Sequence, residues 1–243
     1  MAEGRRILDE EPRSTAELGA LLAERWPDHD PTSLGYAMRN LVPLVQVPPR
    51  GIWGAGGRPI LATAEHWLGR EMSGVSAPDE MVLRYLGAFG PATVADAQAW
   101  SGLSRLREVF ERLRPDLRTF RDEDGRELFD LADGSLPDPD SPAPVRFLPD
   151  FDNALLAHAD RRRIIPDDFA RPPSLVIGQR SVLVDGFVRG TWRLERRSAA
   201  ATLRITLARD VSGPDRDEVE EEGRHLLGFL AAEAASAEVV LAP

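Results

Sequence analysis

The sequence of 243 residues contains no cysteine and no lysine, so that all thirty of its basic residues are arginine. The absence of cysteine excludes disulfide bonds, thiol nucleophiles and zinc sites built on thiolates. The absence of lysine indicates the codon bias of a GC-rich genome rather than a chemical requirement. No stretch approaches the about eighteen apolar residues that span a bilayer, and residues 1–7 lack the apolar core of a secretory signal. We therefore expect a cytoplasmic protein that is not inserted in a membrane.

Acidic residues outnumber basic ones, and the net charge is -10. The charge is unevenly distributed, since residues 146–209 hold 12 Arg against 7 Asp and Glu, a local net charge of +5. A polyanion would be attracted to this segment despite the overall sign. The length exceeds that of a usual single domain, so we expect two or three units.

The first expected unit covers residues 1–74 and follows a plan of helix, turn, helix and β-ribbon. Ser14 is predicted to cap the first helix, with Glu17 at the spacing of a capping box. Residues 27–31 break this helix, and Thr32 or Ser33 is predicted to cap the next one. A strand over 44–47, followed by proline and glycine-rich turns, then has the outline of a wing.

The second expected unit covers residues 79–133 and repeats that plan. A helix over 79–89 precedes a second helix that begins at Thr93 with Asp96, and Ser104 is predicted to cap a third. Two alternating stretches, 117–121 and 126–131, then form a hairpin around Gly125.

A linker rich in proline and acid is expected over residues 134–145, followed by an Arg-rich β domain over 146–243. Several short strands predict a small curved sheet or partial barrel, and 214–235 has the pattern of an amphipathic helix. The expected fold class is therefore α+β, with two tandem winged-helix units followed by a small antiparallel β-barrel-like domain with a C-terminal helix.

Four stretches spread over most of the chain resemble a known family. They are residues 44–55 (LVQVPPRGIWGA), 85–104 (YLGAFGPATVADAQAWSGLS), 147–163 (FLPDFDNALLAHADRRR) and 182–193 (VLVDGFVRGTWR). In this combination and order they resemble the bacterial winged-helix DNA-binding family that includes the AlkZ and YcaQ DNA glycosylases. The resemblance implies tandem winged helices and a β domain that embrace DNA, and an activity that removes alkylated bases or unhooks crosslinks.

The sequence departs from that family at the catalytic motif. The family's glycosylases use a Gln-x-Gln or Gln-x-Asp pair in an additional N-terminal winged helix. Here Gln46, Gln98 and Gln179 are followed at the second position by Pro48, Trp100 and Ser181. We therefore expect no catalytic residue in this chain, which is either a short member that only binds or a sequence whose catalytic winged helix lies upstream of Met1.

The expected partner is double-stranded DNA, contacted mainly through phosphates, because arginine binds phosphates and reads guanine edges. The candidate DNA-binding residues are Arg39, Arg50, Arg58, Arg105, Arg107, Arg161, Arg162, Arg163, Arg189 and Arg193. For Arg105 and Arg107 the alternative is a helix face paired with Glu108 and Glu111. For the arginines of residues 146–209, the alternative is a solvent-exposed sheet face whose positive charge is balanced by the acidic helix 214–235.

Other chemistry is less well supported by the sequence. His29, His66, His158 and His225 are scattered, so neither a metal nor a cofactor is expected, and no oligomeric state is indicated. His158 beside Asp160 could act as a general base. We favour a structural role for the two residues, in which they bond the backbone or a neighbouring arginine at the end of a helix. Asp150 and Asp152 are expected to cap a helix beginning at Asn153. Trp53 and Trp192 could stack on nucleic-acid bases, but we expect them to be core residues.

The favoured function is DNA binding without catalysis. The alternatives are a truncated member of a DNA glycosylase family, acting in repair of alkylated or crosslinked DNA, and a protein-interaction scaffold.

Overall fold

The computed structural model describes residues 1–243 with the exception of 73–76, 168, 170–175, 177 and 243. The chain divides into two compact units, residues 1–76 and 77–243. Both units combine helices with β-sheets, which confirms the expected α+β class. Each unit has its own hydrophobic core.

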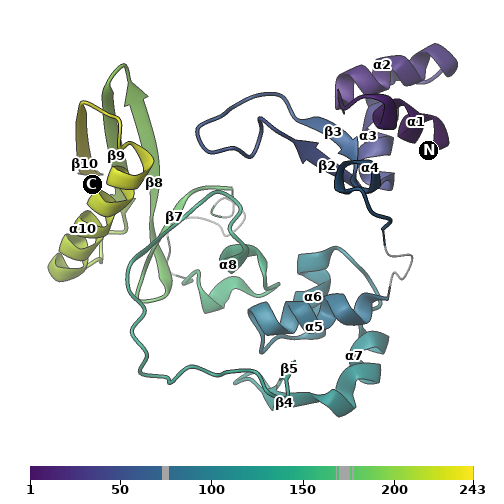
Figure 1. Cartoon of the computed structure of the whole chain (residues 1–243). Helices are drawn as coiled ribbons and strands as arrows, with labels where there is room; N and C mark the ends of the chain where they lie inside the picture. Colours follow the sequence, from purple (N-terminus) through teal and green to yellow (C-terminus); the bar gives the residue numbers. More distant parts are fainter. Residues whose placement is uncertain (73–76, 168, 170–175, 177, 243) are drawn as a thin grey trace. The chain divides into compact units, whose positions relative to one another are not determined.

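The first unit packs helices against a three-stranded antiparallel sheet (Figure 1). Its elements are α1 (Ala2–Glu10), β1 (Arg13–Ser14), α2 (Thr15–Arg25), α3 (Pro31–Leu41), β2 (Leu44–Val47), β3 (Ile60–Thr63) and α4 (Ala64–Leu68). β3 lies between β1 and β2. Residues 48–59, called the 48–59 loop from here on, join β2 to β3 and project beyond the sheet (Figure 1).

Side-chain caps determine where α2 and α3 begin. The Ser14 hydroxyl accepts a hydrogen bond from the Glu17 amide, and the Glu17 carboxylate accepts one from the Ser14 amide at 2.9 Å. This confirms the predicted capping box. The predicted cap at Thr32 or Ser33 is wrong, because α3 begins earlier. Asp30 accepts from the Ser33 amide at 2.7 Å, and a proline occupies the first helical position, where its fixed φ suits a helix.

The helices α2 and α3 cross closely because each has a glycine at the crossing. A Cβ on Gly19 would lie 2.1 Å from the Pro31 carbonyl oxygen, and one on Gly35 would lie 2.3 Å from the Thr15 carbonyl oxygen. The buried side chains of this unit pack around the crossing: Ile7, Leu8, Leu18, Leu22, Met38 and Val42. The crossing holds α3 with one face in the core and the opposite face exposed.

The helix α1 was not expected from the sequence. Only Ile7 and Leu8 of α1 are large and apolar, and both are buried. Polar contacts attach α1 to the sheet and α4: Thr63 donates to the Asp9 carboxylate, and Arg5 pairs with Glu65 at 3.1 Å. So short an apolar pattern does not distinguish a helix from a loop.

The second unit begins with helices and a hairpin. These elements are α5 (Pro78–Phe89), α6 (Val94–Ser101), α7 (Arg107–Leu113), the 3₁₀ turn η1 (Arg114–Asp116), β4 (Leu117–Arg121) and β5 (Glu127–Leu131). Thr93 and Asp96 form the predicted capping box of α6. The predicted hairpin is confirmed, with Gly125 at φ 76° in its turn. The predicted cap at Ser104 is wrong, because Leu106 occupies that position and α7 has no side-chain cap.

These elements follow the same order as those of the first unit. In the first unit, β1 pairs with β3 immediately before the capping box of α2. In the second, Ala92 bridges to Phe129 of β5 immediately before the capping box of α6. Each segment therefore runs from helix to short strand contact, then to two helices and a hairpin.

The remainder of the second unit is a five-stranded sheet with a long helix. Its elements are β6 (Arg146–Leu148), α8 (Asn153–Leu156), the 3₁₀ turn η2 (Arg161–Arg163), β7 (Ser181–Val184), β8 (Phe187–Arg197), β9 (Ala200–Leu207), α10 (Gly213–Leu230) and β10 (Ser236–Ala242). The strand order is β10-β9-β8-β7-β6. Core side chains of α10, such as Val219 and Leu227, pack with Leu203 and Ile205 of β9.

The expectation of an antiparallel, barrel-like sheet needs correction. The described strands form an open sheet with β10 and β6 at its edges, and β10 runs parallel to β9. The reason is the crossover through α10, which returns the chain to the end of the sheet where β9 began. The C-terminal helix ends at Leu230 and not at residue 235.

Candidate nucleic-acid interface

One side of the first unit exposes the polar side chains of α3. Gly35 and Met38 face the core, which leaves Tyr36, Arg39 and Asn40 exposed. The Arg39 guanidinium lies 5.9 Å from the centroid of the Tyr36 ring, and Arg39 makes no ion pair with any residue the structure describes. Together these side chains offer hydrogen-bond donors, hydrogen-bond acceptors and a planar aromatic ring to an external ligand.

Arginines also flank the 48–59 loop. Arg50 donates to the Gly57 carbonyl oxygen at 3.2 Å across the loop, and its side chain is exposed. Arg58 approaches Glu17 at 3.4 Å, with 72% of its side chain exposed. An ion pair so open to water contributes little, so both guanidinium groups remain accessible to an external anion.

Arg105 and Arg107 lie at the beginning of α7 in the second unit. Both are exposed, and neither forms an ion pair with a described residue. Glu111 pairs with Arg114 at 2.7 Å, and it also interacts electrostatically with Arg107. No close ion pair of Arg105 or Arg107 with Glu108 or Glu111 is formed among the described residues, so both guanidinium groups remain open to solvent.

Residues 153–163 dock against α5 and α6 through buried polar contacts. The Tyr85 hydroxyl donates to the Ala157 carbonyl oxygen at 2.7 Å, and the His158 Nε2 donates to the Phe89 carbonyl oxygen at 3.1 Å. Burial raises the pKa of Tyr85 above its ordinary value of 10.0. Burial, and then the charge of Arg163, lower the pKa of His158 below 6.5. Both groups are therefore neutral near pH 7, which suits a structural role.

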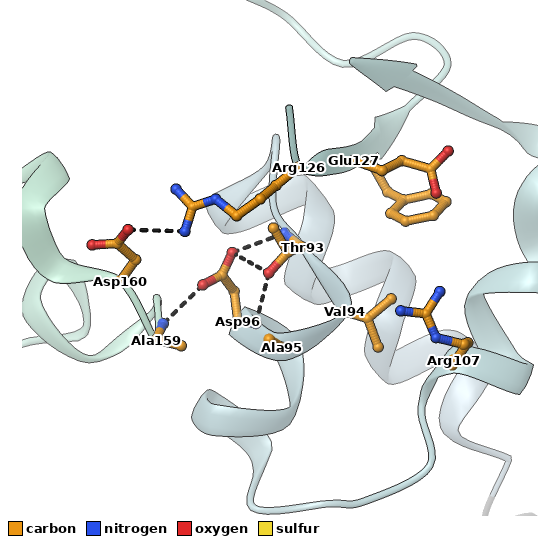
Figure 2. A pocket seen from close by; sticks show the side chains of 10 residues that line it. Thr93, Val94, Ala95, Asp96, Arg107, Arg126, Glu127, Ala159 and Asp160 are labelled. Carbon is orange, nitrogen blue, oxygen red and sulfur yellow. Dashed lines mark hydrogen bonds and ion pairs between the residues drawn. The ribbon is translucent and has the colours of Figure 1, made fainter. Parts of the chain in front are cut away.

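Asp96 completes this docking contact (Figure 2). One of its carboxylate oxygens accepts from the Thr93 amide and hydroxyl at 2.8 Å each, and the other accepts from the Ala159 amide at 2.8 Å. The side chain is 5% exposed. Asp96 thus caps α6 and fixes residues 153–163 at the same time.

The predicted arginine run 161–163 makes mainly internal contacts. Arg161 donates to the Leu155 carbonyl oxygen at 2.9 Å, and Arg163 donates to the Pro91 carbonyl oxygen at 3.1 Å. Arg162 pairs with Asp160 at 2.6 Å and with Asp124 at 3.2 Å. The bonds from Arg162 are the main reason that the pKa of Asp160 lies well below its usual range.

The two predicted arginines of β8 are also paired. Arg189 meets Asp210 at 3.2 Å, and Arg193 meets Glu195 at 2.8 Å. The pairing of β7 with β8 shifts register, so that Val182 opposes Gly190 and Leu183 opposes Val188. The burial pattern along β8 nevertheless alternates, with Val188, Gly190 and Trp192 buried, so Arg189 and Arg193 lie on the same, less buried face.

The structural interpretations of His158, Asp152 and Trp192 are confirmed, whereas the predicted capping role of Asp150 is wrong, because Asp150 pairs with Arg180 at 3.0 Å. Asp152 accepts from the Ala154 amide at the start of α8, and Trp192 is buried, with its indole N–H donating to the Leu148 carbonyl oxygen at 2.9 Å. Trp53 differs from the expectation, because it is exposed in the 48–59 loop.

A cavity of about 340 Å³ lies between α6, the β4–β5 hairpin and residues 159–160 (Figure 2). Arg107 and Arg126 line it together with Asp96, Glu127 and Asp160, so its charges are mixed. Arg126 already pairs with Asp160 at 2.9 Å. Among the residues that the structure describes, no group of three His, Asp or Glu side chains is placed to hold a metal ion. In the same residues, no helix is long and apolar enough to cross a membrane.

The family model of the DNA glycosylase AlkZ-like proteins matches residues 1–229. The chain belongs to the AlkZ-like DNA glycosylase family. The resemblance seen in four stretches of the sequence is thereby confirmed. A search of curated proteins finds no match.

The fold of this AlkZ-like chain is similar to that of the Streptomyces sahachiroi DNA glycosylase AlkZ. The TM-score is 0.69 at 23% sequence identity, and the match covers 99% of this chain and 68% of that chain. The similarity extends over both units and shows a shared fold.

The AlkZ-like chain contains a basic stretch that does not show when charges are counted over long segments. Residues 31–64 contain three arginines and no Asp or Glu, although the whole chain is strongly acidic. This stretch comprises α3, β2, the 48–59 loop and β3. A count over shorter windows would have found it, because the acids of the first unit lie on either side, up to Asp30 and from Glu65.

Proposed function

We propose that this AlkZ-like chain binds duplex DNA, mainly through phosphates, with α3 and the 48–59 loop as its principal contact surface. The observation that carries the proposal is the acid-free stretch 31–64, which presents Arg39, Arg50 and Arg58. A cationic surface with few acidic neighbours attracts DNA through the release of counterions, even when the net charge of the whole molecule is negative.

The arrangement of the helices supports the same proposal. We propose that residues 1–74 and 79–133 are two winged-helix units, because each runs from helix to strand contact, two helices and a hairpin. In such a unit the last helix enters the major groove and the hairpin contacts the flanking backbone. The helix α3 and its equivalent α7 occupy that position. Arg39 is exposed on α3, Arg107 is exposed at the start of α7, and Arg105 is exposed just before α7.

We further propose that the β domain, residues 146–243 beyond the 134–145 linker, supports rather than dominates DNA binding. Its arginines Arg162, Arg189 and Arg193 have carboxylate partners, while Arg161 and Arg163 hold main-chain oxygens. Arg161 and Arg163 would have to give up main-chain bonds to bind phosphate, and Arg162 lies between two carboxylates, which reduces the gain. The contribution of this arginine run is therefore expected to be smaller than that of α3 and the 48–59 loop.

Binding without base excision is the favoured form of this proposal. The three glutamines do not form the Gln-x-Gln pair of the family's glycosylases, and Gln98 instead accepts a hydrogen bond from the Leu106 amide at 3.1 Å, between α6 and α7. Family membership favours the second candidate, a glycosylase of alkylated or crosslinked DNA. Incubation of the chain with duplex containing 7-methylguanine separates the two, because only the second candidate releases free base.

The binding proposal is tested by fluorescence anisotropy with a labelled duplex at several salt concentrations. The affinity is expected to fall by orders of magnitude between about 50 and 200 mM salt. Substitution of Arg39 and Arg50 by alanine should weaken binding and reduce the salt slope by about 2, since each phosphate contact contributes about 0.9. Arg224→Ala on α10 is the matched control. Binding that does not depend on salt, or no binding at low salt, would contradict the proposal.

A further inference from the structure

The tip of the 48–59 loop exposes two large apolar side chains. Trp53 is 70% exposed and Ile52 is 54% exposed. They are neighbours in the chain and lie in the loop that projects beyond the three-stranded sheet (Figure 1). Large apolar side chains that stay mostly exposed side by side are typical of a surface that binds a partner.

Hydrogen bonds order the backbone of the tip. The Ile52 amide donates to the Pro49 carbonyl oxygen and the Ala55 amide donates to the Ile52 carbonyl oxygen, each at 3.1 Å. These are two successive turns with Gly51 and Gly54 in third position, at φ 92° and 72°. A positive φ at this position is what a type II turn requires. The two glycines supply this positive φ, while Trp53 occupies the second position of the second turn.

The charges beside the tip indicate what the apolar pair meets. Arg50 precedes it and Arg58 follows it, and no acidic residue occurs between Asp30 and Glu65. An apolar tip between two cations matches a polyanion that also offers flat apolar surfaces. Nucleic acid has this combination, with phosphates outside and stacked bases inside.

We propose that Trp53, with Ile52 beside it, is a wedge that inserts between adjacent base pairs while Arg50 and Arg58 contact the flanking phosphates. Apolar side chains inserted in this way unstack a base step and kink the duplex. Unstacking costs less where the duplex is already weakened, so the preferred ligand is duplex with a mismatch or another stacking defect. This inference rests on the proposed DNA binding and defines how the contact surface engages its ligand.

The test uses the full chain and duplexes that carry a single 2-aminopurine, whose fluorescence rises when its base unstacks. Wild-type protein is expected to increase the fluorescence and to bind a mismatched duplex more tightly than a matched one. Trp53→Ala should abolish the fluorescence increase and weaken binding by roughly ten-fold, because stacking of a base on an aromatic ring is lost. Trp53→Phe should retain most of both effects, since phenylalanine is also a flat apolar group.

Trp67→Ala is the matched control, because Trp67 is also exposed, at 49%, but lies on α4 outside the loop. Circular dichroism of each variant verifies the fold. Binding by wild type without any fluorescence change, or an unchanged signal in Trp53→Ala, overturns the wedge and leaves the proposed DNA binding intact. No binding of duplex by wild type at low salt overturns both. Self-association or vesicle binding that is lost in Trp53→Ala, without a 2-aminopurine signal, assigns the tip to another partner and also overturns the wedge.

Discussion

Gly19 of α2 lies directly against Gly35 of α3, where a Cβ on Gly19 would come within 3.4 Å of the Gly35 backbone nitrogen. The absence of both side chains brings the two helices close enough to hold α3 in place, with its polar face outward. The position of the proposed DNA-contacting helix therefore depends on a backbone contact in the core.

Gly35→Ala is expected to destabilise the first unit. The new methyl group would meet the Thr15 carbonyl oxygen at 2.3 Å, and overpacking of this kind costs about 1–3 kcal/mol of unfolding free energy, partly offset by the better helix propensity of alanine. Chemical denaturation measures the change. Gly228→Ala in α10 is the control, because nothing lies within 4 Å of its added Cβ, and there the substitution should stabilise by up to about 1 kcal/mol. Equal effects at the two sites would refute the role of the crossing.

Local signals in the sequence predicted the starts of α2 and α6 correctly. Ser14 with Glu17 and Thr93 with Asp96 satisfy amides within three residues, so neighbouring residues alone specify the cap. The same holds for the hairpin turn at Gly125, whose positive φ favours glycine.

Pairings between distant residues were not predictable in this way. Arg126 meets Asp160 and Arg112 meets Asp79, and only the folded chain brings these charges together. The sequence therefore identified where arginines are abundant but not which of them are neutralised. For the same reason it favoured the β segment over residues 31–64, where the arginines have few acidic neighbours.

Asp96→Ala is expected to destabilise the second unit more than Glu17→Ala destabilises the first. Both substitutions remove a capping box, which costs about 0.5–2 kcal/mol. Asp96 in addition accepts from the buried Ala159 amide, and loss of that acceptor adds about 1–3 kcal/mol. Urea unfolding gives the two free energies, and hydrogen exchange at Ala159 should accelerate only in Asp96→Ala. Unchanged protection of that amide would show that Asp96 does not hold residues 153–163.

The stability of the second unit is expected to fall as the pH drops below about 6.5. Burial keeps the pKa of His158 in the folded protein below its ordinary value of 6.5, so the unfolded chain binds a proton that the folded chain does not. The stabilisation is present above pH 6.5 and declines as the pH falls toward the folded pKa.

His158→Gln should reduce that decline, because glutamine retains an N–H donor for the Phe89 carbonyl oxygen but does not titrate. Urea unfolding at about pH 7.5 and about pH 5.5 measures the difference for wild type and variant. His225→Gln, at an exposed position of α10, serves as the control. An identical loss of stability in wild type and His158→Gln would exclude His158 as the responsible group.

The most direct test of the account compares two triple substitutions that remove the same charge from different places. In the first, Arg39, Arg50 and Arg58 become glutamine. In the second, Arg6, Arg84 and Arg224, which are exposed helix residues paired with nearby glutamates, become glutamine. Anisotropy of a labelled duplex at low salt is predicted to show binding by wild type and by the second variant, and a loss of about 100-fold or more in the first. Equal affinities of the two variants would contradict the assignment of DNA binding to α3 and the 48–59 loop.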